Sequence, residues 1–105
     1  MTFFLGLDAS TTATKALIMN ASGRVLGVVS SEYTYETPRP GWTEQHPRLW
    51  WHATAESVRR LLDQCQVDPA SIGGVGLTGQ MHGLVLLDAN DEVLRVAWVF
   101  IILFL

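Results

Sequence analysis

The sequence predicts an α/β fold whose mixed sheet contains a meander of three strands followed by a crossover helix and further strands. Three observations support this prediction. Three short apolar runs separated by turn-forming residues fill residues 3–29, a helical pattern of apolar residues follows Pro47, and another apolar run begins at Ile72. A chain of 105 residues has room for one domain and can bury roughly two-thirds of its unfolded surface, so it can form a core.

The predicted meander consists of Phe3–Leu7, Lys15–Met19 and Val25–Val29, each a short run rich in apolar residues. Asn20–Gly23 has the composition of a tight turn between the second and third strands. Because the runs follow one another closely, we expect them to pair as antiparallel neighbours.

A helix is predicted from Pro47 to the region of Cys65. Proline suits the first helical position, where its missing N–H has no partner to lose. Apolar residues then recur mostly at gaps of three or four, the spacing of one helix face: Trp50, Ala53, Val58, Leu61, Leu62 and Cys65. Thr37–Gly41, with two prolines and a glycine, is a predicted loop before the helix, and Asp68-Pro69 ends the element.

Two apolar runs follow the helix. Ile72–Thr78 is predicted to be a buried strand and Gly83–Leu87 a further strand. Ala89–Asp91 has the composition of a hairpin turn into Glu92–Arg95. The order of meander, helix and returning strand is the α/β plan stated above.

Composition and charge limit the function classes. The net charge is -3 with 7 Lys and Arg and no basic cluster, so nucleic acid is not an expected partner. Cys65 is the single cysteine, which excludes an internal disulfide and fits a reducing cytosol, so we expect a cytoplasmic protein. Met1–Leu7 does not resemble a signal peptide, because no positive region precedes it and Asp8 interrupts it.

The first candidate site is D-A-S-T-T-A-T-K, Asp8–Lys15, between two predicted strands. Such a turn offers phosphate its backbone N–H groups, the Lys15 ammonium and the hydroxyls of Ser10, Thr11 and Thr12. The Asp8 carboxylate, at a strand end, can hold Mg²⁺ directly or through water. The Walker A pattern is absent. The alternative is a plain hairpin in which Asp and Thr side chains satisfy the turn amides.

The second candidate site is G-L-T-G-Q-M-H-G, Gly76–Gly83, directly after a predicted strand. Its glycines allow a ligand to approach the backbone closely, and Gln80 and His82 can hydrogen-bond hydroxyl groups. Ligands of α/β sheets tend to bind beyond the carboxyl ends of strands. The alternative is a tight turn with a structural histidine.

The third segment is P-G-W-T-E-Q-H-P-R-L-W-W, Pro40–Trp51, which holds three tryptophans. Trp42 could stack on a sugar or staple its loop to the helix, and both alternatives stay open. Trp50 is expected to pack under the helix.

Taken in this order, the three segments resemble the FGGY family of carbohydrate kinases, and within it the xylulokinases most. The family opens with a strand, an Asp, a small-residue turn and a basic residue, as in Asp8–Lys15. Xylulokinases carry G-W-x-E-Q-x-P-x-x-W-W, here Gly41–Trp51, and G-Q-M-H-G followed by V-L-L-D, here Gly79–Gly83 and Val85–Asp88. Each motif alone is weak, but three in register are specific, and the resemblance covers residues 3–95.

The resemblance implies the N-terminal part of an actin-like ATPase domain, also called ribonuclease H-like, and an activity that phosphorylates D-xylulose to D-xylulose 5-phosphate with ATP and Mg²⁺. It places Asp8 near the metal and the phosphates. The implied phosphate-binding positions are Ser10, Thr11, Thr12 and Lys15. The implied sugar-binding positions are Met81 and His82, with Gln80 and Trp42 nearby.

The chain departs from the family pattern at three places. Ser10 stands where Gly is frequent, and His46 stands where an acidic residue, a better helix cap, is frequent. After Arg95 the family's Pro-Ala and W-x-D segment gives way to an apolar run. The family's catalytic Asp base, its adenine-binding elements and its second domain are absent, so we expect residues 1–95 to be an incomplete kinase subdomain without turnover of its own.

Three explanations compete for the apolar tail, Val96–Leu105. Out-of-frame or artefactual sequence is favoured, because the family pattern stops abruptly at a strand end. The alternatives are a native buried strand and a membrane-associating tail, although ten apolar residues are about half of what a spanning helix needs. The run has high β-propensity and no charge, so we expect aggregation.

Two further functions stay open beside the kinase. A non-catalytic nucleotide- or sugar-binding remnant with half a site would bind weakly and without turnover. A small membrane-associated protein unrelated to kinases would partition into membranes through its tail.

Overall fold

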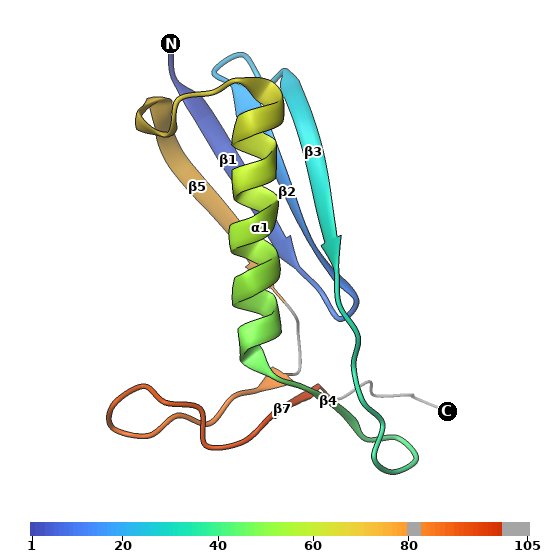
Figure 1. Ribbon diagram of the computed structural model, residues 1–105. Helices are drawn as coiled ribbons and strands as arrows, with labels where there is room; N and C mark the ends of the chain where they lie inside the picture. The colour runs from blue at the N-terminus through green and yellow to red at the C-terminus, as the bar shows by residue number, and fades with distance from the viewer. Residues whose placement is uncertain (80–82, 100–105) are drawn as a thin grey trace.

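The computed structural model describes residues 1–79 and 83–99. Its main sheet has the strand order β3-β2-β1-β5. The strands are β1 (Phe3–Ala9), β2 (Ala13–Asn20), β3 (Val25–Glu32) and β5 (Ile72–Gly79). β1, β2 and β3 form an antiparallel meander, and β5 returns parallel to β1 after the helix α1 (Pro47–Cys65) (Figure 1). The predicted mixed sheet with a three-strand meander and a crossover helix is confirmed.

The turn between β2 and β3 forms where the sequence predicts it. The side-chain Oδ1 of Asn20 accepts hydrogen bonds from the backbone N–H groups of Ser22 and Arg24, at 3.1 and 3.0 Å. Gly23 has φ +86°, a conformation that glycine adopts without steric cost. This local hydrogen bonding sets the direction in which β3 returns along β2.

The helix α1 begins at Pro47, as predicted. His46 caps it, because its Nδ1 accepts a hydrogen bond from the backbone N–H of Arg48 at 3.1 Å. His46 therefore caps the helix although it is not an acidic residue. The residues of α1 that are buried lie four apart, on one face: Ala53, Ser57 and Leu61.

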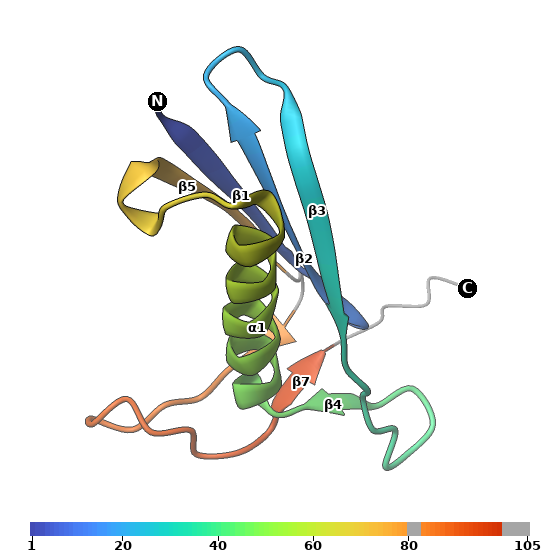
Figure 2. The ribbon, with the colours of Figure 1, turned by 45° about the horizontal axis from the view of Figure 1, so that its top comes forward.

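α1 packs over β2 and β3 on one face of the main sheet (Figure 2). Because side chains alternate between the two faces of a strand, every second residue of the meander points toward the helix. The buried core formed in this way comprises Leu5, Ala16, Ile18, Val29, Leu61 and Val67. Cys65, on the predicted apolar face of the helix, packs against this core and is partly buried.

The prediction that residues 72–78 form a buried strand is right about the strand and wrong about its burial. Val75 and Leu77 are 59% and 74% exposed. β5 pairs with β1 at one edge of the main sheet, whereas α1 packs chiefly on β2 and β3, further across. The helix therefore does not cover the apolar side chains of β5.

A smaller sheet has the order β4-β7-β6. Its strands are β4 (Thr43–Gln45), β7 (Ala97–Val99) and β6 (Gly83–Leu84), and β7 pairs antiparallel with both neighbours. The hairpin turn predicted around residues 89–91 is confirmed, because Leu87 bridges Val93 and the backbone N–H of Asp88 donates to the Glu92 carbonyl at 2.9 Å. Residues 97–99 of the predicted tail thus pair within this sheet, and residues 100–105 lie outside the described residues. The division of the chain at residue 95 stays a prediction.

Candidate functional site

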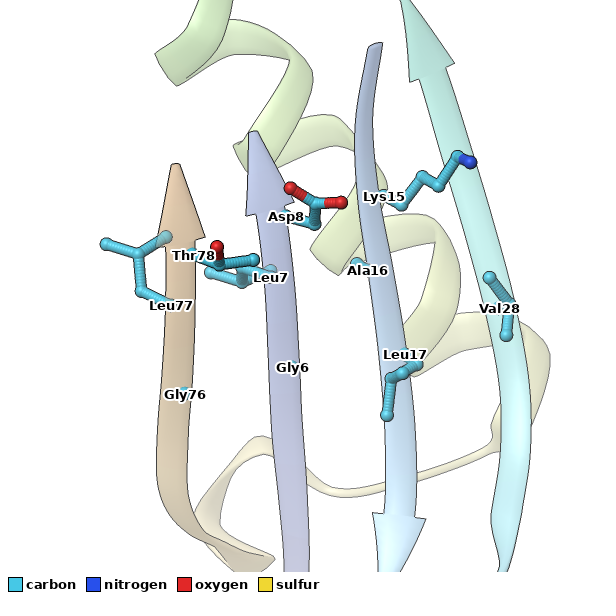
Figure 3. A pocket seen from close by; sticks show the side chains of 10 residues that line it. All are labelled: Gly6, Leu7, Asp8, Lys15, Ala16, Leu17, Val28, Gly76, Leu77 and Thr78. Carbon is cyan, nitrogen blue, oxygen red and sulfur yellow. The ribbon is translucent and has the colours of Figure 1, made fainter. Parts of the chain in front are cut away.

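Asp8 of β1 pairs with Lys15 of β2, near the end of β1 and the start of β2. Figure 3 shows both side chains at one end of a hollow of about 480 Å³ on the face opposite α1. Neither side chain takes part in a salt bridge within residues 1–79 and 83–99. The carboxylate and the ammonium are therefore both available to a charged ligand at this end of the sheet.

Two paired glycines form part of the lining of this hollow. Gly6 of β1 lies directly beside Gly76 of β5, and both line the hollow. A Cβ added at Gly76 would meet no atom within 4 Å, so the space in front of it is open. Thr78 pairs with Asp8 from β5 and also lines the hollow. This threonine belongs to the G-L-T-G-Q-M-H-G segment, but it was not among the site residues predicted from the sequence.

Lys15 also lines a second hollow of about 500 Å³, at the end of the β1–β2 hairpin. Its other lining residues are Thr12, Ala13, Ser30, Glu32, Tyr33 and Thr34. The structure therefore brings Lys15 together with Asp8 on one side and with Thr12 on the other.

The turn between β1 and β2, Ser10–Thr12, is held by its carbonyl oxygens. The Tyr33 hydroxyl donates to the Ser10 carbonyl, and the Tyr33 backbone N–H donates to the Thr12 carbonyl at 2.9 Å. The Gln45 side-chain amide donates to the Thr11 carbonyl. In a trans peptide the N–H points away from the C=O, so the N–H groups of Thr11 and Thr12 point away from these donors.

Ser10 takes part in the turn itself. Its hydroxyl and its backbone N–H donate to the Ala13 carbonyl, at 3.0 and 2.9 Å. Ser10 thus stabilises the turn as a donor to a carbonyl, whereas the predicted alternative was that Asp and Thr side chains satisfy the turn amides. A phosphate contact from Ser10 stays a prediction.

Tyr33 keeps its proton well into the alkaline range. Burial raises the pKa of its hydroxyl, a hydrogen bond from Thr14 lowers it, and the nearby Asp8 carboxylate raises it. The net pKa lies above the ordinary value of 10.0. The hydroxyl can therefore act as a hydrogen-bond donor to the turn carbonyls at neutral pH.

The predicted sugar-binding residues are not gathered with these groups. Trp42 lines neither hollow; it is 43% exposed, and the guanidinium carbon of Arg39 lies 5.0 Å from its ring centroid. Gln80, Met81 and His82 lie outside the described residues. The sugar-binding role of all four residues stays a prediction.

Sequence reasoning missed Tyr33 and Gln45. Gln45 stood in the quoted G-W-x-E-Q segment, two residues before the helix, and its place in that motif was the available signal. Tyr33 belongs to none of the three segments, and no local pattern distinguished it.

Asp8 can offer a metal ion the two oxygens of one carboxylate. Among the described residues, no group of three or more His, Cys, Asp or Glu side chains is placed to hold a metal ion. Mg²⁺ in phosphate sites is usually held by one or two carboxylates together with phosphate oxygens and water, so Asp8 fits such a role. In the part of the chain that the structure describes, no helix is long and apolar enough to cross a membrane.

The chain is similar to known sugar and glycerol kinases. A model of the N-terminal domain of the FGGY family of carbohydrate kinases matches residues 3–101. The xylulose kinase of Escherichia coli K12 is 37% identical over 94 residues, which are 90% of this chain and 19% of that protein. A glycerol kinase of Thermococcus onnurineus is 32% identical over 98 residues, which are 93% of this chain and 20% of that protein.

A solved structure supports the same relationship. A crystal structure described as a "xyloylose kinase" from Brucella ovis has a TM-score of 0.87 and 38% identity, and the match covers 91% of this chain and 20% of that one. The predicted fold class, part of an actin-like ATPase domain, is confirmed by this likeness. The chain spans about a fifth of the length of the proteins it matches.

Proposed function

The chain belongs to the FGGY family of carbohydrate kinases, and we propose that it forms the phosphate-binding part of an ATP-dependent kinase that phosphorylates D-xylulose. The observation that carries the proposal is the β1–β2 turn, whose carbonyls accept hydrogen bonds from the protein while Asp8 and Lys15 flank it. The choice of sugar is supported by the xylulokinase-like segments and by relatives named xylulose kinase at 37% identity.

Phosphoryl transfer depends mainly on positioning and on neutralising charge. The N–H groups of Thr11 and Thr12 and the Thr12 hydroxyl would donate to phosphate oxygens, and the Lys15 ammonium would add a positive charge beside them. The Asp8 carboxylate would hold Mg²⁺, directly or through water. Bound there, the metal supplies charge neutralisation at the phosphate oxygens.

The proposed sugar contacts come from Met81 and His82, with Gln80 and Trp42 nearby, by resemblance to xylulokinases. Support comes from the sheet, because β5 ends at Gly79, which pairs with Ala9 at the end of β1. The chain thus enters the segment 80–82 at the same end of the sheet where the phosphate turn begins. Ligands of α/β sheets tend to bind beyond the carboxyl ends of the strands, which lie here. A cytoplasmic location fits a kinase that draws on ATP.

Titration of the 105-residue chain with ATP–Mg²⁺, followed by NMR, tests the proposal. We expect weak binding with amide shifts concentrated in Asp8–Lys15, and roughly tenfold weaker binding for Asp8→Asn and for Lys15→Ala. Arg24→Ala is the matched control, because Arg24 is an exposed cation in the β2–β3 turn, at the far end of β2. Absence of shifts at millimolar ATP, or equal losses in all three variants, would contradict the proposal.

A kinase assay separates the proposal from its alternatives. Because the chain spans about a fifth of its relatives, we expect binding without turnover from the isolated chain. ADP release above background would contradict this expectation. Binding of D-xylulose in preference to glycerol would support the sugar assignment, and binding of glycerol in preference to D-xylulose would refute it.

A further inference from the structure

Gln45 is the last residue of β4, which leads directly into α1 (Figure 2), and it is 2% exposed. Strand alternation buries Thr43 and Gln45 on one side of β4, while Glu44 between them pairs with Arg95 at 2.7 Å. On the helix side, Pro47 starts α1 and His46 caps it. The backbone of Gln45 is thus fixed from both directions.

The Gln45 amide bonds to three groups at once. Its Nε2 donates to the Thr11 carbonyl and, at 3.2 Å, to the Thr34 carbonyl. Its Oε1 accepts a hydrogen bond from Trp50 Nε1 at 2.9 Å. An indole N–H can only donate, so the amide must turn its oxygen to Trp50 and its two N–H groups to the carbonyls. Trp50 thereby determines how Gln45 meets the turn.

Trp50 reaches Gln45 because of helix geometry. It lies in the first turns of α1, where side chains lean toward the helix N-terminus. Its indole therefore projects back over the link that precedes the helix. The tryptophan-rich segment thus connects α1 to the β1–β2 turn through one buried amide.

The bond from Gln45 to the Thr11 carbonyl fixes the peptide unit between Thr11 and Thr12. Rotation of this peptide unit would exchange an outward N–H for an outward carbonyl oxygen, which repels phosphate. We propose that Gln45 is a positioning residue that keeps this peptide unit in its phosphate-donating orientation, with Trp50 orienting the Gln45 amide. The inference rests on the function proposed above, since it assigns the G-W-x-E-Q segment a role at the same site.

Two variants of the 105-residue chain test it. Trp50→Phe keeps an aromatic side chain and removes the indole N–H, and Gln45→Met keeps the length and removes the two N–H donors and the acceptor oxygen. ATP–Mg²⁺ affinity is measured by NMR titration, together with hydrogen exchange of the Thr12 amide and unfolding in urea. Ser57→Ala is the control. Ser57 is buried between α1 and β3, so its substitution should lower the free energy of unfolding without changing any contact of the β1–β2 turn.

We expect both variants to bind ATP–Mg²⁺ up to about tenfold more weakly and to exchange the Thr12 amide faster. Ser57→Ala should lose stability and bind as the unmodified chain does. Equal affinity in all four proteins, corrected for the folded fraction, would overturn the inference and leave the proposed function intact. Failure of the unmodified chain to bind would overturn both. Should Gln45→Met not fold, Trp50→Phe decides the matter alone.

Discussion

The Ser57 hydroxyl on α1 donates a hydrogen bond of 2.7 Å to the Ser31 hydroxyl on β3, and the two side chains are 0% and 6% exposed. The pair joins the helix to the sheet inside an otherwise apolar contact. A buried hydroxyl is tolerated there only while it keeps its partner.

Ser57→Ala should lower the free energy of unfolding by about 1–3 kcal/mol, because it leaves the buried Ser31 hydroxyl without a partner. Urea unfolding followed by circular dichroism measures this. The double variant Ser31→Ala, Ser57→Ala should lose less than the sum of the two single changes, and exposed Ser30→Ala should change little. Additive losses would show that the bond does not stabilise the helix–sheet contact.

Gly27→Ala should destabilise the chain by about 1–3 kcal/mol. An added Cβ would lie 2.7 Å from the Cys65 sulfur and 3.3 Å from Leu61 Cδ1. Gly76→Ala, on β5 at the opposite edge of the sheet, is the matched control, because its Cβ meets nothing within 4 Å. If the two variants unfold at the same urea concentration, crowding at Cys65 is not the reason for the glycine.

Tyr33→Phe should flatten the pH dependence of stability above about pH 10. In the unfolded chain a tyrosine releases its proton at about pH 10. In the folded chain the pKa of Tyr33 is raised, chiefly by burial, so the hydroxyl stays protonated to higher pH. The unfolded state then binds fewer protons, so stability is complete below pH 10 and falls as pH rises through the folded pKa. Unfolding free energies at several pH values check this. Tyr35→Phe, at an exposed position, should retain the fall, and a fall that persists in Tyr33→Phe would exclude Tyr33 as its source.

Leu61→Ala and Leu77→Ala should differ sharply in this chain. Leu61 is 0% exposed in the core, so its truncation should cost about 2–5 kcal/mol. Leu77 is 74% exposed on β5, so its truncation should cost less than about 0.5 kcal/mol. Urea unfolding of both variants provides the comparison. A large loss from Leu77→Ala would mean that β5 is covered in solution, for instance by a second copy of the chain.

Local pattern was enough to predict the meander, the turn at Asn20–Gly23 and the start of α1 at Pro47, since each depends on residues adjacent in sequence. It failed for the burial of β5, because burial depends on what packs above a strand. The contact between Gln45 and the Thr11 carbonyl spans 34 positions, so no periodicity could predict it. Asp8 and Lys15 were predictable as neighbours because a hairpin places them opposite each other.

The pairing of β1 with β5 also has a consequence for the order in which the chain folds. Leu5 pairs with Val75, so about 70 residues must be in place before this ladder can close, whereas β1, β2 and β3 need only short loops. Contacts close in sequence form early and long-range parallel pairing forms late. During synthesis, the β1–β2 hairpin that carries the phosphate turn should therefore form while the other side of β1, which pairs with β5, is still unpaired.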